Sequence, residues 1–309
     1  MAAPSFQPIN HDESYAYLAD PVARTSTWSK LKYAPVGGED GPVWASFGGE
    51  LRLRAERKDN ERFGRGLQDH GGDFQTRVRL WAELNLGTSL RAFVDVQDAR
   101  TSGLDSGEPA SEESRTDLHQ AFIEARTELA GGRLRVRAGR QEMGIAPYRL
   151  VDVREGANAR RALDLVRVLY DSPTGWSGDA FAGYALREGK ASWDDATDFD
   201  YRLYGATAAK TLGQGATAPK LTLGANTAGL WRQSKDDGLY ALSSMVLRGA
   251  NEGQSSYVGW RTGVFARYAL TPHISLMGVA NYTKAGDFLK ETGTAKDQSY
   301  LGTFLTFRF

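Results

Sequence analysis

The chain has 309 residues, of which 41% are apolar, and its 38 basic and 38 acidic residues give it a formal net charge of zero. No apolar run approaches the ~20 residues that a membrane helix needs, which excludes a helical membrane protein. The balanced charge gives no indication of nucleic-acid binding, and the absence of cysteine fits an exported chain and a cytosolic one alike. Arg outnumbers Lys 28 to 10, a bias that suits a crowded ionic interior, because Arg tolerates partial burial and binds carboxylates bidentately.

Residues 1–43 differ from the rest of the chain in having no strand pattern. They include Pro4, Pro8, Pro21 and Pro35. We expect this N-terminal segment either to stay outside the main body of the protein or to enter it as a partial plug.

From residue 44 onward, polar and apolar residues alternate with period two. In residues 75–86 (QTRVRLWAELNL), Val78 and Leu80 fall on one face, and Arg77 and Arg79 fall on the other. A strand sorts residues in this way, whereas a helix would scatter them around its circumference. We expect about twelve strands, near residues 44–56, 74–87, 89–98, 117–129, 133–143, 163–171, 175–187, 199–211, 219–233, 256–269, 273–284 and 297–309.

The connections between these strands are alternately short and long. Short turns are expected at 87–88, 130–132, 172–174, 213–215 and 271–272, and long polar loops at 57–73, 99–116, 144–162, 188–198, 234–255 and 285–296. This arrangement is typical of the periplasmic turns and extracellular loops of an outer-membrane barrel. A soluble β-sandwich also alternates, but its charged face would normally mix Lys, Glu, Thr and Ser, whereas here Arg with Glu or Asp dominates.

We therefore predict an all-β fold: a transmembrane antiparallel up-and-down β-barrel of about twelve strands in the bacterial outer membrane. Residues 44–309 form the barrel, and residues 1–43 form a periplasmic or plug-like segment. An outer-membrane protein is secreted with a signal peptide and none precedes Ala2, so we expect Met1 to begin a chain that lacks its signal sequence.

The C-terminus supports the barrel independently. Residues 300–309 (YLGTFLTFRF) alternate and end in Phe309, which looks like the signal read by the barrel-assembly machinery. Aromatic residues also gather near strand ends, as interfacial girdles require: Trp44, Phe47, Trp176, Tyr184, Tyr257, Trp260, Tyr268 and Tyr282. The expected partners are outer-membrane lipid, lipopolysaccharide and that machinery. No nucleic acid is expected, and we expect a monomer because nothing suggests an oligomer interface.

Several segments resemble the alginate-export family of outer-membrane porins. They are YLADPVARTSTWSKLKYAPVG, SFGGELRLRAER, DLHQAFIEAR, LRVRAGRQEM with LVDVREGANARRALDLVRV, and GDFLKETG, and the GRQE…LVDVREG.N.RR stretch is the most specific. The resemblance covers residues 15–170 and roughly 234–309. It implies a barrel that passes anionic polysaccharide, or related solutes, through an electropositive constriction. Between about residues 205 and 232 the chain is much shorter than the family pattern, so a natural short member and an engineered deletion both stay open.

The alternation also predicts which charged residues point into the barrel. The cations are Arg52, Arg54, Arg77, Arg79, Arg91, Arg126, Arg135, Arg137, Arg167, Arg261, Arg267 and Arg308, and they face Glu50, Glu56, Glu83, Asp95, Glu124 and Glu128. Excess basic charge in a low-dielectric tube concentrates anions, and Arg holds sugar carboxylates by paired hydrogen bonds. We predict a porin-like channel with an Arg-rich lumen for anionic saccharides such as alginate, or for small anions. The alternative is that these ions pair with one another and fill the lumen.

The segment 139–161 interrupts the pattern. Arg140 falls on the face predicted for lipid, and a β-bulge at Gly139 would return it to the lumen. By resemblance, the following loop could fold inward and constrict the pore; a solvated extracellular loop is the equal alternative. The candidate pore-lining set is completed by Arg140, Glu142, Asp152, Arg154, Arg160 and Arg161.

Other chemistry has little support. The four histidines match no metal-ligand spacing, and the paired acids at 194–195 and 236–237 could bind calcium but are more often simply hydrated. We expect no metal and no cofactor. A barrel enzyme would need a nucleophile–base pair, yet His119 is predicted on the apolar face without a partnered Ser, so we predict that the protein is not an enzyme. A closed structural or adhesive barrel is the further alternative.

Overall fold

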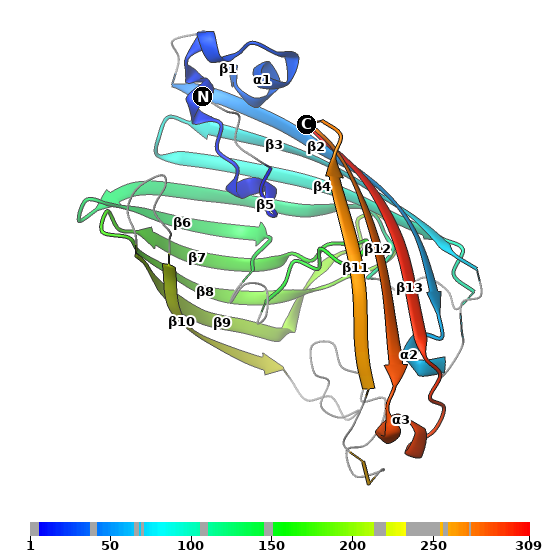
Figure 1. Ribbon diagram of the computed structural model, residues 1–309. Helices are drawn as coiled ribbons and strands as arrows, with labels where there is room; N and C mark the ends of the chain where they lie inside the picture. Colours follow the sequence, from blue (N-terminus) through cyan, green and yellow to red (C-terminus); the bar gives the residue numbers. More distant parts are fainter. Residues whose placement is uncertain are drawn as a thin grey trace.

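The computed structural model describes residues 6–37, 42–64, 68, 71–105, 111–144, 151–212, 221–232, 254–255, 259–271 and 273–309. Twelve strands form one antiparallel sheet in the order β10-β9-β8-β7-β6-β5-β4-β3-β2-β13-β12-β11 (Figure 1). They are β2 (Val43–Asp59), β3 (Asp73–Leu86), β4 (Leu90–Ser102), β5 (Ser114–Leu129), β6 (Gly132–Gln141), β7 (Leu163–Asp171), β8 (Trp176–Arg187), β9 (Ala196–Leu212), β10 (Leu221–Arg232), β11 (Gly259–Ala269), β12 (Ile274–Ala285) and β13 (Gln298–Arg308). The predicted strands and their up-and-down order are confirmed. Within the described residues, the sheet is not closed between β10 and β11.

The connections alternate in length as predicted wherever the structure describes them. Gly87–Ser89, Ala130–Gly131 and 172–175 are short turns at one end of the sheet, and the connections across 60–72, 103–113 and 142–162 are long loops at the other. We call these the turn end and the loop end. Both chain termini lie at the turn end (Figure 1). The predicted turn at 213–215 lies outside the described residues.

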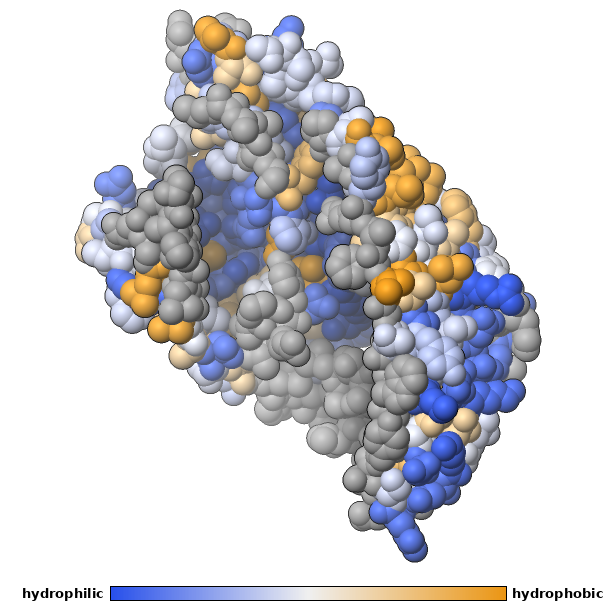
Figure 2. Space-filling model, viewed as in Figure 1, coloured by the Kyte–Doolittle hydropathy of each residue, from blue (hydrophilic) through white to orange (hydrophobic). Residues whose placement is uncertain are grey.

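The two faces of the sheet have opposite chemistry. On the outward face Val78 is 39% exposed and Leu80 is 56% exposed, whereas the side chains of Arg77 and Arg79 on the inner face are buried. A soluble protein buries apolar residues and exposes charged ones, so this inverted pattern suits a sheet surrounded by hydrocarbon. Figure 2 shows a mainly hydrophilic hollow inside the curved wall.

The inner face also holds apolar side chains. Trp81, Phe93 and Phe122 form one cluster on β3, β4 and β5. A second cluster on β7, β8 and β9, which Met143 joins, consists of Met143, Leu163, Leu165, Phe181 and Leu203. These side chains fill part of the interior, as expected of a small barrel.

The helices are short; most lie at the two ends of the sheet, and η1 enters the interior. The N-terminal segment contains η1 (Asn10–Asp12), η2 (Ala16–Ala19), η3 (Pro21–Ala23), α1 (Thr27–Lys32) and the two-residue strand β1 (Ala34–Pro35), which pairs with β2. At the loop end lie α2 (Glu61–Gly64) and α3 (Asp287–Glu291). In the part of the chain that the structure describes, none of these helices has the length and apolar character to cross a bilayer.

Two local predictions are wrong. His119 is not on the apolar face but is 3% exposed on the inner side, because it has no pairing partner where the register of β5 against β4 shifts. The bulge lies there, in β5, and not at Gly139, where β6 keeps continuous register with both neighbours. Arg140 therefore stays on the outward face, where its Nε donates to Asp164 Oδ1 at 3.0 Å.

Candidate functional site

Glu142, just after β6 at the loop end, contacts basic side chains from three parts of the chain. Its fully buried carboxylate accepts hydrogen bonds from Arg160 Nε at 2.5 Å and Arg160 Nη2 at 2.9 Å. Its Oε1 lies 2.8 Å from His119 Nε2 and 3.2 Å from Arg79 Nη2, and Arg79 also pairs with Asp95. The charges in this cluster are desolvated but matched, which is the condition under which buried ions are tolerated.

Two more carboxylates organise further arginines of this wall. Glu50 accepts from Arg77 Nε at 2.8 Å and from Arg308 Nε at 2.7 Å. Glu124 accepts from Arg91, Arg126 and Arg137 at 2.6–3.0 Å. Arg137 and Arg91 also lie over the Phe122 ring, 4.5 and 5.5 Å from its centroid. Much of the predicted positive charge is therefore neutralised within the wall.

The loop between β6 and β7 folds into the interior. We call its residues 151–162 the inward loop. Arg52 donates to the carbonyl oxygens of Glu155 at 3.0 Å and Ala157 at 2.6 Å, and Arg54 donates to that of Gly156 at 2.6 Å. The Asn158 side chain is fully buried, and its amide donates at 3.1 Å to backbone carbonyls of three other segments. Of the two alternatives left open by the sequence, the structure has the inward one.

The GRQE…LVDVREG.N.RR stretch, the most specific part of the family resemblance, contains residues that hold this loop in place. Glu142 and Arg160 form the buried pair described above, and Arg154 and Arg161 both contact Glu188, at 2.6 and 3.4 Å. The motif residues thus hold the inward loop against the wall.

The N-terminal segment reaches the same interior from the turn end. Asn10 donates to Asp95 at 3.0 Å and accepts from Gln120 at 3.0 Å, while His11 Nδ1 lies 2.7 Å from Gln120 Oε1. Arg160 donates to the Pro8 carbonyl at 2.8 Å, which joins this segment to the inward loop. The N-terminal segment and the inward loop therefore meet in the interior, against side chains of β4 and β5.

A cavity of about 920 Å³ remains between the N-terminal segment, β2, β12, β13 and the inward loop. Besides His273, its charged lining residues are four cations and one carboxylate, Glu155. The cations are Lys32, Arg52, Arg54 and Arg308. Arg54 and Arg308 also form ion pairs, with Glu56 and Glu50, and Arg52 Nη1 lies 3.8 Å from a Glu155 carboxylate oxygen. Lys32 is thus the lining cation without an ion pair among the described residues.

Lys32, the last residue of α1, is the least expected of these cations. It is 5% exposed, and its Nζ has no hydrogen-bond partner among the described residues. The Nζ lies 4.8 Å from the ring centroid of Tyr15 and 5.1 Å from that of Trp81. Burial lowers the pKa of Lys32 to about 8, and Glu13 and Glu83 only partly oppose that shift.

The predicted pore-lining residues fall into three groups. On the inner face of the wall or in the ion-paired cluster are Arg52, Arg54, Arg77, Arg79, Arg91, Asp95, Glu124, Arg126, Arg135, Arg137, Glu142, Arg160 and Arg167. Away from it are Arg140 on the outward face, the exposed Asp152, and Arg154 and Arg161, which pair with Glu188. The side chains of Arg261 and Arg267 lie outside the described residues.

Several buried polar residues were not predicted from the sequence. Lys32, Asn10 and His11 lie in a segment without periodicity, and Gln120 follows the register shift in β5. The only signal for Lys32 is its place in the N-terminal stretch that resembles the family, because no strand alternation assigns it a face.

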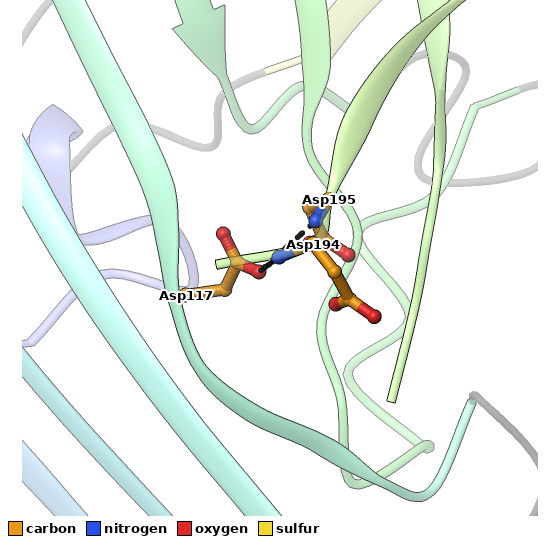
Figure 3. A group of neighbouring side chains, drawn as sticks. All are labelled: Asp117, Asp194 and Asp195. Atoms are coloured by element: carbon orange, nitrogen blue, oxygen red, sulfur yellow. Dashed lines mark hydrogen bonds between the residues drawn. The ribbon is translucent and has the colours of Figure 1, made fainter. Parts of the chain in front are cut away.

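The acids at 194–195, which could bind calcium, lie close to a third acid. Hydrogen bonds within the chain account for this proximity. Oxygen atoms of Asp117, Asp194 and Asp195 lie within 4.8 Å of one another. As Figure 3 shows, Asp117 Oδ2 accepts from the backbone N–H groups of Asp194 and Asp195, at 2.8 and 3.0 Å. Burial and the nearby Asp117 raise the pKa of Asp195 to about 6. The acids at 236–237 lie outside the described residues.

Comparisons with known proteins agree with this architecture. The alginate export family profile matches residues 43–211, which is more than half of the chain. The fold is similar to that of OprB from Pseudomonas putida, with a TM-score of 0.56 and 11% identity over 86% of this chain and 94% of that one. An anion-selective porin from Comamonas acidovorans aligns with a TM-score of 0.41 and 9% identity, over 86% of this chain and 100% of the porin. No curated protein matches the chain. The chain belongs to the alginate export family and is a β-barrel channel of the bacterial outer membrane.

Proposed function

We propose that this channel passes anionic saccharides, such as alginate, or small anions. The observation that supports the proposal is the lining of the 920 Å³ cavity, where four cations face one carboxylate. Arg52 and Arg54 donate to neutral carbonyl oxygens of the inward loop, and their Nε atoms are buried without hydrogen-bond partners among the described residues. Arg54 also pairs with Glu56, so Lys32 and Arg52 are the lining cations without a close carboxylate partner among the described residues. Positive charge in a low-dielectric passage raises the local concentration of anions.

Reversal potentials under a salt gradient in planar bilayers test the proposal. A unit charge about 5 Å from the ion path contributes about 0.8 kcal/mol in water, equivalent to about a fourfold change in local anion concentration. Arg52→Gln should therefore shift the reversal potential toward cation permeation and weaken block by oligouronate. Arg57→Gln is the matched control, because Arg57 is exposed on the opposite face of the same strand. Cation selectivity in the wild type would contradict the proposal.

We also propose that residues 1–43 act as a plug at the periplasmic end. The hydrogen bonds of Asn10, His11 and the Pro8 carbonyl to buried side chains support this role. A plug held by such contacts would make the channel open rarely at rest.

A closed structural barrel is the second candidate. The matched ion pairs around Glu50, Glu124 and Glu142 favour it, because they fill the interior with side chains that satisfy one another. Absence of conductance from correctly folded protein, persisting after removal of residues 1–20, would favour the closed barrel.

Two partner assignments are further proposals. The terminal Phe309 follows a strand with alternating apolar residues, which supports recognition by the barrel-assembly machinery. We propose a monomer in the membrane, which crosslinking in detergent and in native membrane would test.

A further inference from the structure

Lys32 has a site built around it. A Cβ atom at Gly48 would lie 2.4 Å from Lys32 Nζ and 2.5 Å from the Trp81 ring, so the glycine leaves the space that the ammonium and the indole occupy. Tyr15 covers the ammonium from the N-terminal segment. Three separate elements thus position a charged group that has no hydrogen-bond partner among the described residues.

A buried ammonium without an acceptor is costly unless a ligand supplies one. Lys32 lines the 920 Å³ cavity, whose volume lies near the upper end of the roughly 300–1,000 Å³ typical of small-molecule sites. Glu13 and Glu83 are the acids whose charges act on Lys32, and neither forms a hydrogen bond or a close ion pair with its Nζ. The cavity therefore offers both a donor and room for an acceptor.

The rest of the cavity wall indicates which acceptor fits. Tyr17, Trp28 and Phe304 are among its lining residues. Aromatic rings offer flat apolar surfaces that suit the C–H face of a pyranose ring, and their polar edges suit its hydroxyl groups. Arg308, on the β13 side, adds a second cation to the lining, with its Nε and Nη2 already paired with Glu50.

We propose that Lys32, with the aromatic wall of this cavity, forms a discrete binding site for one uronate residue of an acidic saccharide at the periplasmic mouth of the channel. The proposal rests on the proposed function and adds to it that the N-terminal segment contributes to ligand binding. The saccharide is then captured by Lys32 before it meets Arg52 and Arg54. The lowered pKa of Lys32 supports this arrangement, because a carboxylate bound at Nζ would favour the charged form.

Calorimetric titration of the full chain in detergent with a tetrauronate tests the site, with a neutral tetraglucoside as the comparison ligand. Lys32→Met removes the charge and keeps the length of the side chain. We expect it to weaken tetrauronate binding at least tenfold and to leave the neutral ligand unaffected. Lys30→Met is the matched control, because Lys30 is exposed on the same helix. In the wild type, affinity should fall as pH rises through about 8, and Lys32→Met should abolish that fall.

A second measurement needs no substitution and remains informative if Lys32→Met does not fold. Reductive methylation of the wild type, mapped by mass spectrometry, should show tetrauronate protecting Lys32 at least fivefold and the tetraglucoside giving no protection. Equal modification of Lys32 with and without tetrauronate would overturn the site, as would unchanged affinity in a folded Lys32→Met variant.

Conductance separates this inference from the proposed function. If Lys32→Met loses tetrauronate binding but keeps anion-selective current, the site is supported and the channel proposal stands. If the wild type is anion-selective but Lys32→Met binds tetrauronate normally, the site is overturned and only the channel proposal stands. A wild type without anion selectivity contradicts the channel proposal, and the protection of Lys32 then decides the site by itself.

Discussion

Replacing Glu142 with alanine removes the carboxylate that holds the inward loop to the wall. Glu142 is fully buried, and both of its oxygens accept hydrogen bonds from Arg160. Without it, Arg160 and Arg79 keep their charges in a buried place but lose a counter-ion. Removing one partner of a buried ion pair typically costs about 3–5 kcal/mol.

The lower end of that range applies to this cluster. Arg79 keeps its pairing with Asp95, and Arg160 keeps its hydrogen bond to the Pro8 carbonyl. We therefore expect loop docking to weaken by about 3 kcal/mol, which corresponds to roughly a hundredfold rise in the population of undocked loop. Glu142→Gln, which keeps an acceptor oxygen but no charge, should have a smaller effect.

Limited trypsin digestion of the folded protein measures that population. When opening and closing are fast relative to cleavage, the cleavage rate follows the opening equilibrium. Arg154 and Arg161 are the relevant sites, since both are partly buried and lie in the inward loop. Cleavage there should be roughly a hundredfold faster in Glu142→Ala than in the wild type, and the single-channel current should become larger and noisier.

The control is Glu128→Ala, which removes an exposed acid near the turn end of β5. If Glu142→Ala is folded, as judged by its heat-modifiable band on a gel, and is cut no faster than Glu128→Ala, the ion pair does not hold the loop. The reasoning from buried charge would then be refuted.

Three other predictions follow from single sites. Gly139→Ala should sharply reduce the folded, heat-modifiable fraction, because Gly139 has φ of +128° and a Cβ there would lie 2.3 Å from the Ala121 carbonyl oxygen; normal folding would contradict the close approach. Removing the His11 side chain by His11→Ala should loosen the N-terminal segment and raise the open probability in planar bilayers, and an unchanged open probability would count against the plug. The folded-state pKa of Asp195 is raised to about 6, so its ionisation costs stability increasingly between about pH 4 and pH 6. Asp195→Asn should gain thermal stability relative to the wild type across that window, and a constant difference between pH 4 and pH 7 would contradict the raised pKa.

The sequence was sufficient to predict the wall because strand alternation is a local and repeated signal. Arg79 and Leu80 are adjacent in the chain and have opposite exposures, as period two requires. The same rule failed at His119, where one unpaired residue in β5 changes which residues point inward. A bulge of this kind depends on the partner strand, and nothing within the strand itself marks it.

Gly139 shows a second limit of prediction from the sequence. Glycine within a strand predicts either a bulge or a close backbone approach, and we expected the bulge. The structure has the close approach, with Gly139 paired to Phe122 in unbroken register. Arg140 remains outward near the loop end, where Asp164 neutralises it.

The interior contacts could not be predicted because they join segments far apart in the chain. Asn158 donates to carbonyl groups of residues 46 to 82 positions away, and Asn10 bonds to Asp95 across 85 positions. Neither segment has a periodic pattern. The family resemblance indicated that the inward loop is important. Only the burial and the partners of its charged side chains show that they hold the loop to the wall.

The pairing of β13 with β2 joins the last strand of the chain to the first long one. Arg308 and Glu50 meet across 258 positions, and Phe309 and Gly49 exchange two backbone hydrogen bonds of 3.0 Å. Contacts of such long range carry the largest loop-closure entropy and form late. Trp28 packs against Phe307 and Phe309, so the N-terminal segment can make these contacts only after the last strand has paired. A chain that ends before β13 would therefore lack both the partner strand of β2 and this anchor for α1. It would present an unpaired edge at β2 and a loosely held N-terminal segment to proteases.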